Sequence, residues 1–391
     1  FGPLTLLRSV AELRYGIYSN LERAQKTLGS DPISLWIRPI LKADHESKYP
    51  ELQINQPADE NTIFLNAALP AWMYSDMITK LRPENCGVIL KAGVVLAAKP
   101  GKTLKFSTGF HSELAGLTAF AGDLDDLPAL PGWIWDYLDL ISPALDFDLQ
   151  LWKKDNDFLP RLPAELSTLD DRHIYISNTA QISKYVHLDA SHGPIIIDED
   201  CKVSPFSALE GPLYLGKRST IKPGTSIRHS VVGQVCNLGG EIKGSILHPY
   251  SNKSHAGFLG DSILGSWINI GAGTITSNLK NNYQAIRVSW AGNNYDTERQ
   301  FLGTILGDHS KTAIGVRLNT GTLIGTFCNV FQEDFPPRAM PSFSWGNGTH
   351  ELDKAIDTAK RVLGRRNLSL TPSHEALIRA LAADHTPFTH F

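Results

Sequence analysis

The amino-acid sequence predicts a two-domain protein, with a mixed α/β domain followed by a parallel β-helix built from six-residue repeats. Its 391 residues, of which 42% are hydrophobic and 20% charged, are enough to form two cores. In the first third of the chain, short aliphatic runs alternate with helix-like stretches. In the second half, aliphatic residues recur at every sixth position.

The first domain is predicted to span residues 1–132. Alternation of short strands with helices is typical of a partly parallel sheet covered by helices. Because the chain begins at Phe1 rather than at methionine, we expect further residues before it. The candidate elements are helix-like stretches at 10–28 and 70–81 and aliphatic runs at 62–65, 87–90 and 94–97.

A linking arm is predicted at residues 133–172. The pattern from residue 133 to 152 is helical and amphipathic. A charged stretch that contains prolines follows, which is typical of a domain boundary.

The β-helix is predicted at residues 173–335. A six-residue period suits a triangular coil in which each side contributes one short strand, one turn and one inward aliphatic residue. Glycine and asparagine suit the corners, where positive φ is often required. The aliphatic residues are Ile197, Val203, Leu209, Leu215, Ile221 and Ile227, and in a second run Leu318, Ile324 and Val330.

An ordinary half-buried strand is the alternative, because it also places apolar residues six apart. Such strands rarely exceed about ten residues, whereas this register continues through Pro205, Pro212 and Pro223. Proline is excluded from central strands but suits the corner of a coil. The pattern therefore favours the β-helix.

The repeat is interrupted once and then ends. Between residues 287 and 303 the hexads disappear, and we expect a loop that leaves the coil. The repeat stops at Phe335, and the remaining residues, 336–391, are predicted to form a helical tail with a helix at about 352–366. Cations in its last turn suit a helix C-terminus, with a phosphate contact as the alternative.

Charge and cysteine content exclude several classes of function. A net charge of −3 gives no field that would attract nucleic acid or an anionic membrane. No apolar run approaches the roughly 18 residues of a membrane span. The four cysteines have neither zinc-site nor disulfide spacing, which favours reduced thiols and a cytoplasmic location.

One part of the coil, residues 241–278, is rich in polar residues and glycine. It contains Glu-Ile-Lys at 241–243, Ser-Asn-Lys-Ser-His-Ala-Gly-Phe-Leu-Gly-Asp at 251–261 and Asn-Ile-Gly-Ala-Gly-Thr-Ile-Thr-Ser-Asn at 269–278, close to a family pattern E-x-K, S-K-x-x-H-x-x-Y-L-G-D and N-I-G-A-G-T-I-T-x-N. This run resembles the acetyltransferase domain of the bifunctional N-acetylglucosamine-1-phosphate uridylyltransferase/glucosamine-1-phosphate acetyltransferases, the GlmU-like family. The resemblance implies a left-handed β-helix, a homotrimer, acetyl-CoA in the groove between adjacent coils, and a role in UDP-GlcNAc biosynthesis.

The resemblance assigns two catalytic residues. His255 matches the base that removes a proton from the sugar amine, a task that suits a side chain whose pKa is about 6.5. Ala272 matches the residue whose backbone N–H faces the developing oxyanion. The alternative for His255 is a hydrogen-bonded structural histidine.

The resemblance also assigns residues that hold the acceptor. Lys243 matches a lysine that binds the sugar phosphate, and Lys222 stands where the family has an arginine. A solvated lysine at a coil corner is the alternative for both. Asn269 and Asn278 match asparagines near the sugar.

Two departures concern the acceptor. Phe258 stands where the family has a substrate-binding tyrosine. After Asn278 the family continues with Tyr-Asp-Gly and a lysine, whereas this chain continues with Leu279 and Lys280. The acyl-transfer residues are therefore retained while the acceptor sugar is expected to differ.

The first domain resembles a Rossmann-like sugar nucleotidyltransferase through its opening Pro-Leu-Thr5. Val10 occupies the position of the family's catalytic lysine, and Arg8 and Arg14 are near enough to replace its charge. Asn66 occupies the turn of the magnesium-binding aspartate, so Mg²⁺ is expected only if this site is active. Asp123, Asp125 and Asp126 form an acidic cluster for which a solvated loop is the better interpretation.

Three functions remain open. The first is an acetyl-CoA-dependent N-acetyltransferase acting on an amino-sugar 1-phosphate. The second is a sugar-1-phosphate nucleotidyltransferase that forms a UDP- or dTDP-sugar. The third is a β-helix retained only for trimerisation.

Overall fold

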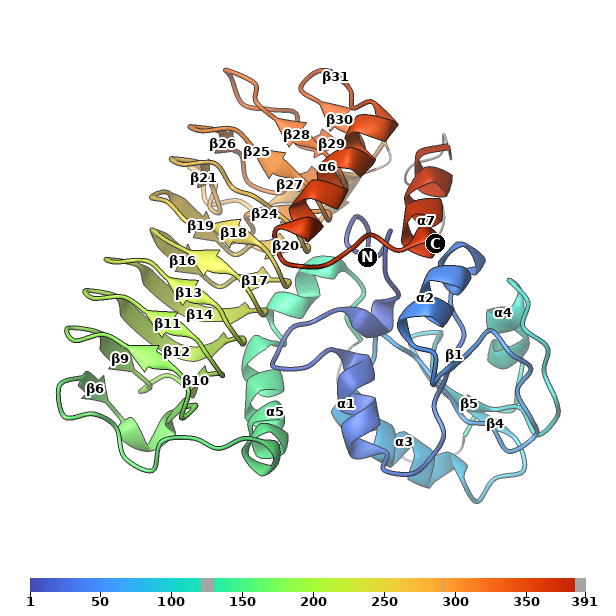
Figure 1. Cartoon of the computed structure of the whole chain (residues 1–391). Helices are drawn as coiled ribbons and strands as arrows, with labels where there is room; N and C mark the ends of the chain where they lie inside the picture. The colour runs from blue at the N-terminus through green and yellow to red at the C-terminus, as the bar shows by residue number, and fades with distance from the viewer. Residues whose placement is uncertain (121–129, 291, 384–391) are drawn as a thin grey trace. The chain divides into compact units, whose positions relative to one another are not determined.

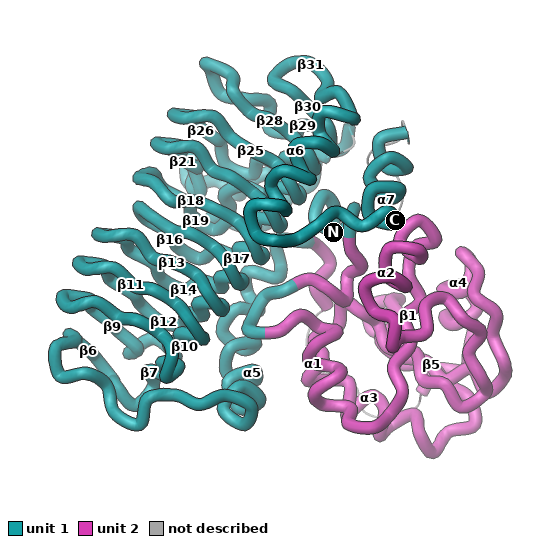
Figure 2. Tube along the Cα trace, viewed as in Figure 1, with its two compact units in different colours: residues 1–7, 14–17, 134–391 teal, residues 8–13, 18–133 magenta. Residues whose placement is uncertain are grey.

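The computed structural model describes residues 1–120, 130–290 and 292–383, and the chain divides into two compact units (Figures 1 and 2). Unit 1 comprises Phe1–Leu7, Arg14–Ile17 and Ile134–Phe391, and unit 2 comprises Arg8–Leu13 and Tyr18–Trp133. Each unit has its own hydrophobic core.

Unit 2 is a small α/β unit with an antiparallel sheet in the order β3-β5-β4. Met77 and Leu81 of helix α3 pack with Ile89 and Leu96 of this sheet in one buried cluster. The elements are a 3-10 turn Val10–Glu12, α1 Asn20–Thr27, β1 Ser34–Leu35, a 3-10 turn Pro39–Leu41, α2 Lys42–Lys48, β2 Gln53–Ile54, β3 Phe64–Leu65, a 3-10 turn Ala71–Met73, α3 Tyr74–Leu81, β4 Gly87–Lys91, β5 Val94–Lys99 and α4 Phe110–Ala115.

The three aliphatic runs are strands, as predicted, and they pair antiparallel with one another. Strands β4 and β5 are joined by Ala92 and Gly93, which both have positive φ, as in a tight hairpin. A parallel pair would need a crossover of a dozen or more residues. In the described part of unit 2, parallel pairing is limited to β1 with β2 and a bridge from Val88 to Ala119.

The helix predicted at residues 10–28 is interrupted. A 3-10 turn at its start is followed by extended backbone, and helix α1 begins only after Ser19. Ser19 accepts a hydrogen bond from the Glu22 N–H while the Glu22 carboxylate accepts from the Ser19 N–H. This capping box fixes the start of helix α1 at Asn20, whereas the aliphatic pattern predicted one continuous helix through this position.

The arm in unit 1 consists of a 3-10 turn, Ile134–Leu138, and helix α5, Ile141–Asp155. Helix α5 packs on strands β12 and β14 of the coil. Trp152, buried in the interface, donates from Nε1 to Asp198 at 3.3 Å, and Tyr214 donates its hydroxyl to the same carboxylate at 2.7 Å. The predicted amphipathic helix is therefore present, and its buried face lies against the coil.

The coil is a parallel β-helix, as predicted. Ile197 pairs with Leu215, the third aliphatic residue after it in the predicted series, so one turn of the coil contains three hexads. The aliphatic residues of both predicted runs are at most 1% exposed and belong to one continuous core. The residues that the six-residue period predicted to point inward therefore form the interior of the coil.

Three faces make up the coil, and Figure 1 shows their strands stacked in successive turns. Face 1 contains β6 Ser167–Leu169, β9 His187–Asp189, the first parts of β12 Ala208–Leu215 and β14 Ser226–Val232, β16 Glu241–Lys243, β19 Phe258–Gly260, β21 Ile275–Thr276 and β26 Arg317–Leu318. Face 2 contains β7 Ile174–Ile176, β10 Ile195–Ile197, the last parts of β12 and β14, β17 Ile246–Leu247, β20 Ile263–Leu264, β24 Thr304–Leu306, β27 Thr322–Ile324 and β29 Ala339–Met340. Face 3 contains β8 Gln181–Ile182, β11 Lys202–Val203, β13 Thr220–Ile221, β15 Asn237–Leu238, β18 Asn252–Lys253, β25 Lys311–Thr312, β28 Asn329–Val330 and β30 Ser344–Trp345.

The predicted interruption is an antiparallel hairpin of β22, Arg287–Trp290, and β23, Asn293–Asp296. It lies in a long insertion between faces 1 and 2, because Leu264 pairs directly with Leu306.

The coil does not stop at Phe335 but continues for another partial turn. Met340 pairs with Ile324 and is buried, and Trp345 pairs with Asn329. The spacing between Ile324 and Met340 is not a multiple of the repeat, so this last turn departs from the strict period that the prediction used. Strand β31, Gly348–Thr349, then folds back antiparallel on β30 and ends the stacking.

The tail contains two helices, α6 Leu352–Gly364 and α7 Pro372–Ala383, of which the first was predicted. Ile356, Ala359 and Leu363 of α6 are buried, as the pattern indicated. No helix among the described residues has both the length and the apolar character that a membrane span requires.

Candidate active site on the coil

The corners that join face 3 to face 1 form a continuous row, here called the corner row, at residues 204–207, 222–225, 239–240, 254–257, 271–274 and 313–316. His255 lies in this row, directly after strand β18, and is exposed. Within the described residues its imidazole makes no hydrogen bond. Its side chain is therefore free to meet a substrate.

Ala272 lies in the next corner of the row. The Gly273 N–H donates to the Ala256 carbonyl at 3.0 Å, which joins this corner directly to that of His255. A Cβ on Gly271 would lie 2.3 Å from the carbonyl oxygen of Ala313, so glycine is needed for the close stacking. No hydrogen bond of the Ala272 N–H is present in the described residues, which suits a donor reserved for an oxyanion.

Lys222 and Asn269 are also on or beside this row. The Lys222 N–H donates to the Leu238 carbonyl, which places Lys222 two turns of the coil before His255. Asn269 is exposed and pairs with Asn252 on one side and Lys311 on the other.

Lys243 lies at the far end of face 1, where it lines a cavity of about 650 Å³ in unit 1. In the strand register Lys243 is directly opposite Arg228. Both cations line the cavity together with Arg299. Three carboxylates, Asp139, Glu210 and Asp261, line it as well. Guanidinium and ammonium groups are the usual protein partners of phosphate, which would compete here with these carboxylates for the cations.

Phe258 and Asn278 lie beside Lys243. Both cover Gly260, where an added Cβ would be 2.5 Å from Phe258 Cζ and 2.8 Å from Asn278 Nδ2. Gly260 is itself opposite Lys243 in the register. The Asn278 amide donates to the Asp261 carboxylate at 2.5 Å, and this carboxylate also lines the cavity. The structure therefore brings Lys243, Phe258 and Asn278 together.

Lys280 points elsewhere: its Nζ donates to the Ala285 carbonyl within its own loop at 2.6 Å. From the same insertion, Arg299 reaches the cavity and binds both oxygens of Asp139 at 2.7 and 2.5 Å. The insertion thus presents Arg299 to the cavity instead of Lys280.

Sequence reasoning missed Arg228, His229 and Arg299. Arg228 precedes Lys243 by one turn of the coil, but this turn is shorter than three hexads, so the six-residue period does not place the two residues opposite one another. His229 lines the same cavity with positive φ. Burial lowers its pKa, and the charge of Lys243 acts in the same direction, while Asp261 opposes both. Arg299 lies in a non-repetitive insertion and gave no signal.

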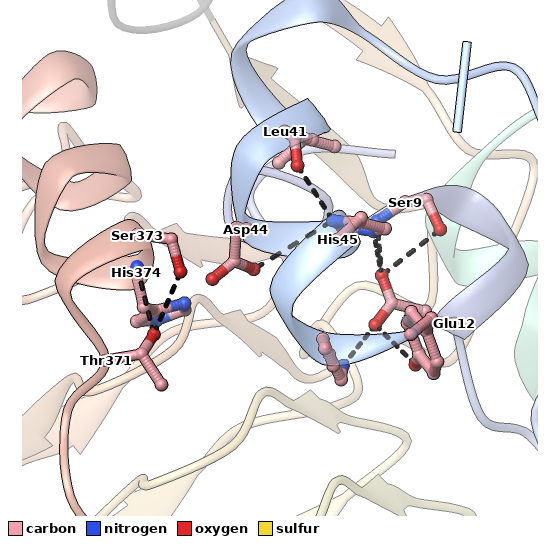
Figure 3. A network of polar contacts seen from close by, with 10 residues as sticks. Ser9, Glu12, Leu41, Asp44, His45, Thr371, Ser373 and His374 are labelled. Carbon is pink, nitrogen blue, oxygen red and sulfur yellow. Dashed lines mark hydrogen bonds and ion pairs between the residues drawn. The ribbon is translucent and has the colours of Figure 1, made fainter. Parts of the chain in front are cut away.

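In unit 2, a buried polar network surrounds Glu12 (Figure 3). Its carboxylate accepts from the Ser9 N–H at 2.8 Å, His45 Nε2 at 2.6 Å and the Tyr49 hydroxyl at 2.9 Å, and forms an ion pair with Lys48. Burial alone would raise the pKa of Glu12, but the hydrogen bond from His45 and the charge of Lys48 hold it well below its ordinary value.

The predicted nucleotide-site residues are divided between the units. Thr5 and Arg14 belong to unit 1, and Arg8 and Asn66 to unit 2. The Asn66 amide donates to the Val95 carbonyl at 2.8 Å, and its oxygen accepts from the Ala68 N–H at 2.9 Å. These bonds stabilise the turn. Because residue 66 is an asparagine, this turn offers no carboxylate to bind magnesium.

In the parts of the chain that the structure describes, no group of three or more His, Cys, Asp or Glu could hold a metal ion. Asp123, Asp125 and Asp126 lie outside the described residues.

Comparison with known proteins identifies a matching family and several relatives. Residues 1–157 match the sugar nucleotidyl transferase family. The bifunctional sugar-1-phosphate nucleotidylyltransferase/acetyltransferase of Sulfurisphaera tokodaii is 29% identical over 198 residues, which cover 50% of this chain and 45% of that protein. The bifunctional protein GlmU of Methanococcus vannielii is 34% identical over 124 residues, which cover 30% of this chain and 29% of that protein. The chain spans less than half the length of these relatives.

Among solved structures, a hexapeptide transferase family protein from Anaplasma phagocytophilum is 15% identical and covers 55% of this chain and 92% of its own, with a TM-score of 0.26. Because this TM-score is low, the β-helix is assigned from the strand pairing described above and not from this similarity.

Proposed function

We propose, from the premise that this chain is a relative of the GlmU-like proteins, that it transfers an acetyl group from acetyl-CoA to the amine of an amino-sugar 1-phosphate. His255 is the base and the Ala272 N–H is the oxyanion donor. The relationship confirms the family resemblance expected from the sequence, while the acceptor and the reaction are our proposal.

One observation carries this proposal: the corner of His255 is hydrogen-bonded to the corner of Ala272 through Gly273 and Ala256. A proton acceptor and a backbone N–H donor are thus held on adjacent turns of the same rigid coil. General-base catalysis and oxyanion stabilisation need these two groups at a fixed separation.

The reaction proceeds by addition and elimination. The sugar amine attacks the thioester carbonyl as His255 takes the proton that the amine loses. Negative charge develops on the carbonyl oxygen, where the Ala272 N–H donates a hydrogen bond. The C–S bond then breaks, and the thiolate of CoA leaves with the proton returned by the imidazolium, which restores the neutral base.

The sugar phosphate is proposed to bind in the cavity at Arg228 and Lys243. Face 1 leads from this cavity to the corner row along the three residues of β19, roughly 10 Å at the usual strand rise. That is the scale of a phosphorylated monosaccharide. Phe258 covers the face between the two ends, so an apolar ring meets the sugar where the family has a tyrosine.

The assembly is proposed to be a homotrimer in which CoA lies along the groove between neighbouring coils, as in the family that the sequence resembles. We place the protein in the cytoplasm, where the buried thiols of Cys201, Cys236 and Cys328 remain reduced.

The test is thiol release from acetyl-CoA with glucosamine 1-phosphate and related amino-sugar phosphates. His255→Ala is expected to lower kcat by about 10²- to 10⁴-fold, while His187→Ala, which changes a histidine of β9 on an earlier turn, leaves kcat unchanged. Equal turnover by wild type and His255→Ala would exclude His255 as the base.

The family match of residues 1–157 favours a second candidate, nucleotidyl transfer to a sugar 1-phosphate. The described residues fit this activity poorly, because Asn66 supplies no carboxylate for Mg²⁺. Pyrophosphate release from UTP or dTTP with sugar 1-phosphates tests it. Inactivity in both assays, with a stable trimer in solution, would leave assembly as the function of the coil.

A further inference from the structure

Lys253 occupies an inward position of the coil. It is the second residue of β18 and pairs with Leu238 on the preceding turn. Ile221 and Val203 hold the same position on the earlier turns, and both are buried aliphatic residues. The side chain of Lys253 is 1% exposed. A lysine thus stands at an inward position that is aliphatic on each of the three preceding turns.

The ammonium of Lys253 is bound by backbone carbonyl groups of two successive corners. It donates to the Gly239 carbonyl at 2.8 Å and to the His255 carbonyl at 2.8 Å. A Cβ on Gly240 would lie 3.0 Å from Nζ, so the glycine leaves room for the ammonium. Burial lowers the pKa of Lys253 to about 8, with no carboxylate to offset it. The lysine therefore connects the corner row from inside the coil.

An ammonium group in this position costs stability that a leucine would not cost. Burial of a charge without an ionic partner is unfavourable, and replacement of buried charges by apolar residues of similar volume is often neutral or stabilising. Structural needs alone therefore do not account for a lysine here. Its hydrogen bond to the His255 carbonyl has a direct effect, because it holds the backbone of His255 in place.

The hydrogen bonds continue from Lys253 to the oxyanion donor. Lys253 holds the carbonyl of His255, and the next carbonyl, that of Ala256, accepts from the Gly273 N–H. Gly273 follows Ala272 directly. A short chain of bonds thus joins the buried ammonium to both groups of the proposed reaction.

We propose that Lys253 is a positioning residue of the acyltransfer site. Its ammonium fixes the corner that carries His255 relative to the corner that carries Ala272. This inference rests on the proposed function for its catalytic consequence, whereas the effect on the placement of His255 can be measured without turnover.

The first experiment measures the placement of His255 in the full chain. Histidine rings are labelled with ¹³C in a deuterated background, and the His255 signals are assigned with His255→Gln. Lys253→Met removes the ammonium but keeps the length of the side chain. We expect it to shift or broaden the His255 ring signals and to leave those of His173 unchanged.

The matched control is Leu238→Met, which introduces the same side chain at the paired position one turn earlier and removes no hydrogen bond. It should leave the His255 signals as in the wild type. Identical His255 signals in wild type and Lys253→Met would overturn the inference. The thermal midpoint of Lys253→Met, expected to be equal to or above that of the wild type, shows that the variant is folded.

The second experiment measures kinetics. Lys253→Met should lower kcat on the order of 10- to 100-fold, as expected for a small misplacement of the base, with KM for acetyl-CoA within about 2-fold. Leu238→Met should retain the wild-type kcat. If kcat of Lys253→Met equals that of the wild type while His255→Ala is inactive, the inference fails and the proposed function stands. If His255→Ala retains full turnover, the proposed function fails, and the ring signals alone decide the placement.

Discussion

The interior of the coil and the buried network of unit 2 are stabilised in different ways. In the coil, inward positions such as Ile221 and Ile227 are aliphatic and exclude water completely. In unit 2, Glu12 and His45 are almost as deeply buried but are polar and hydrogen-bonded to one another. The first interior tolerates any apolar residue that fits, whereas the second requires each partner to be present.

The difference is clearest at His45. Its Nδ1 faces the Leu41 carbonyl at 3.1 Å, and its Nε2 faces the Glu12 carboxylate. The same carboxylate forms an ion pair with Lys48. The comparison therefore predicts that loss of the Glu12 charge costs more than the loss of a methyl group from the coil.

The largest effect is expected for Glu12→Gln. It removes the buried carboxylate charge that accepts hydrogen bonds from Ser9, His45 and Tyr49 and pairs with Lys48, so the free energy of unfolding of unit 2 should fall by about 3 to 5 kcal/mol. Urea unfolding and hydrogen exchange of unit 2 peptides measure it. Glu46→Gln, which removes only a surface ion pair with Lys42 at 3.6 Å, should cost less than about 1 kcal/mol. If both variants lowered the free energy of unfolding equally, the buried network around Glu12 would stabilise unit 2 no more than a surface ion pair does.

A truncation in the coil should have a comparable or smaller effect. Ile221→Ala leaves a cavity in a fully buried position and should cost about 2 to 5 kcal/mol. Ile314→Ala, on a corner where the side chain is 79% exposed, should remain within about 0.5 kcal/mol. Hydrogen exchange in unit 1 peptides should detect the first change and not the second. If Ile221→Ala changed hydrogen exchange only in unit 2 peptides, this prediction would be wrong.

The outer surface of the coil should affect binding rather than stability. If the sugar phosphate binds at Arg228 as proposed, Arg228→Met should remove a charge-assisted hydrogen bond worth about 1.5 to 3 kcal/mol and raise KM for the sugar phosphate about 10- to 150-fold. Lys222→Met, in the corner row, should change KM less than about 3-fold. The reverse order would assign the phosphate to Lys222, as the sequence motif suggested, and not to the residue opposite Lys243.

The smallest effect concerns pH. Burial lowers the pKa of Lys253 and Lys311 to about 8. From pH 8 to 9 the unfolded chain retains these protons while the folded coil releases them, so stability of unit 1 rises with pH, by at most about 1.4 kcal/mol per unit for each lysine. Buried Cys201 and Cys236, whose pKa is raised to about 12, and Cys328, whose pKa is raised to about 11, oppose this gain in the same interval, because unfolded thiols lose their protons near pH 8.5. Urea unfolding at pH 8 and 9 should therefore show a more favourable change in stability for the wild type than for the Lys253→Met/Lys311→Met double variant, which keeps all three cysteines.

The stability of unit 2 should depend on pH in the acid range. The pKa of Glu12 is held below its unfolded value by His45 and Lys48. Its contribution is therefore complete above about pH 4.3 and is lost as the pH falls toward the folded pKa. Glu12→Gln should abolish this part of the acid transition, and an unchanged acid profile would contradict the assignment.

Much of the coil could be predicted because its information is local. Residues such as Leu215 and Ile324 mark inward positions by spacing alone, and strand pairing follows from the repeat. The exact end could not be predicted, since Met340 departs from the period. In unit 2 the aliphatic runs predicted the strands but not their mutual direction, which the hairpin at Ala92 and Gly93 makes antiparallel.

The sequence by itself determined the β-helix, the arm and the candidate residues His255, Ala272 and Lys243, because a short period and a contiguous motif lie within a few dozen residues. Only the tertiary structure decided which side chains face one another. It placed Arg228 opposite Lys243, directed Arg299 into the cavity instead of Lys280, and turned Lys253 inward beneath His255. Those relations depend on turns of unequal length and on one insertion, and a strand register in space is set by the whole coil rather than by any single segment.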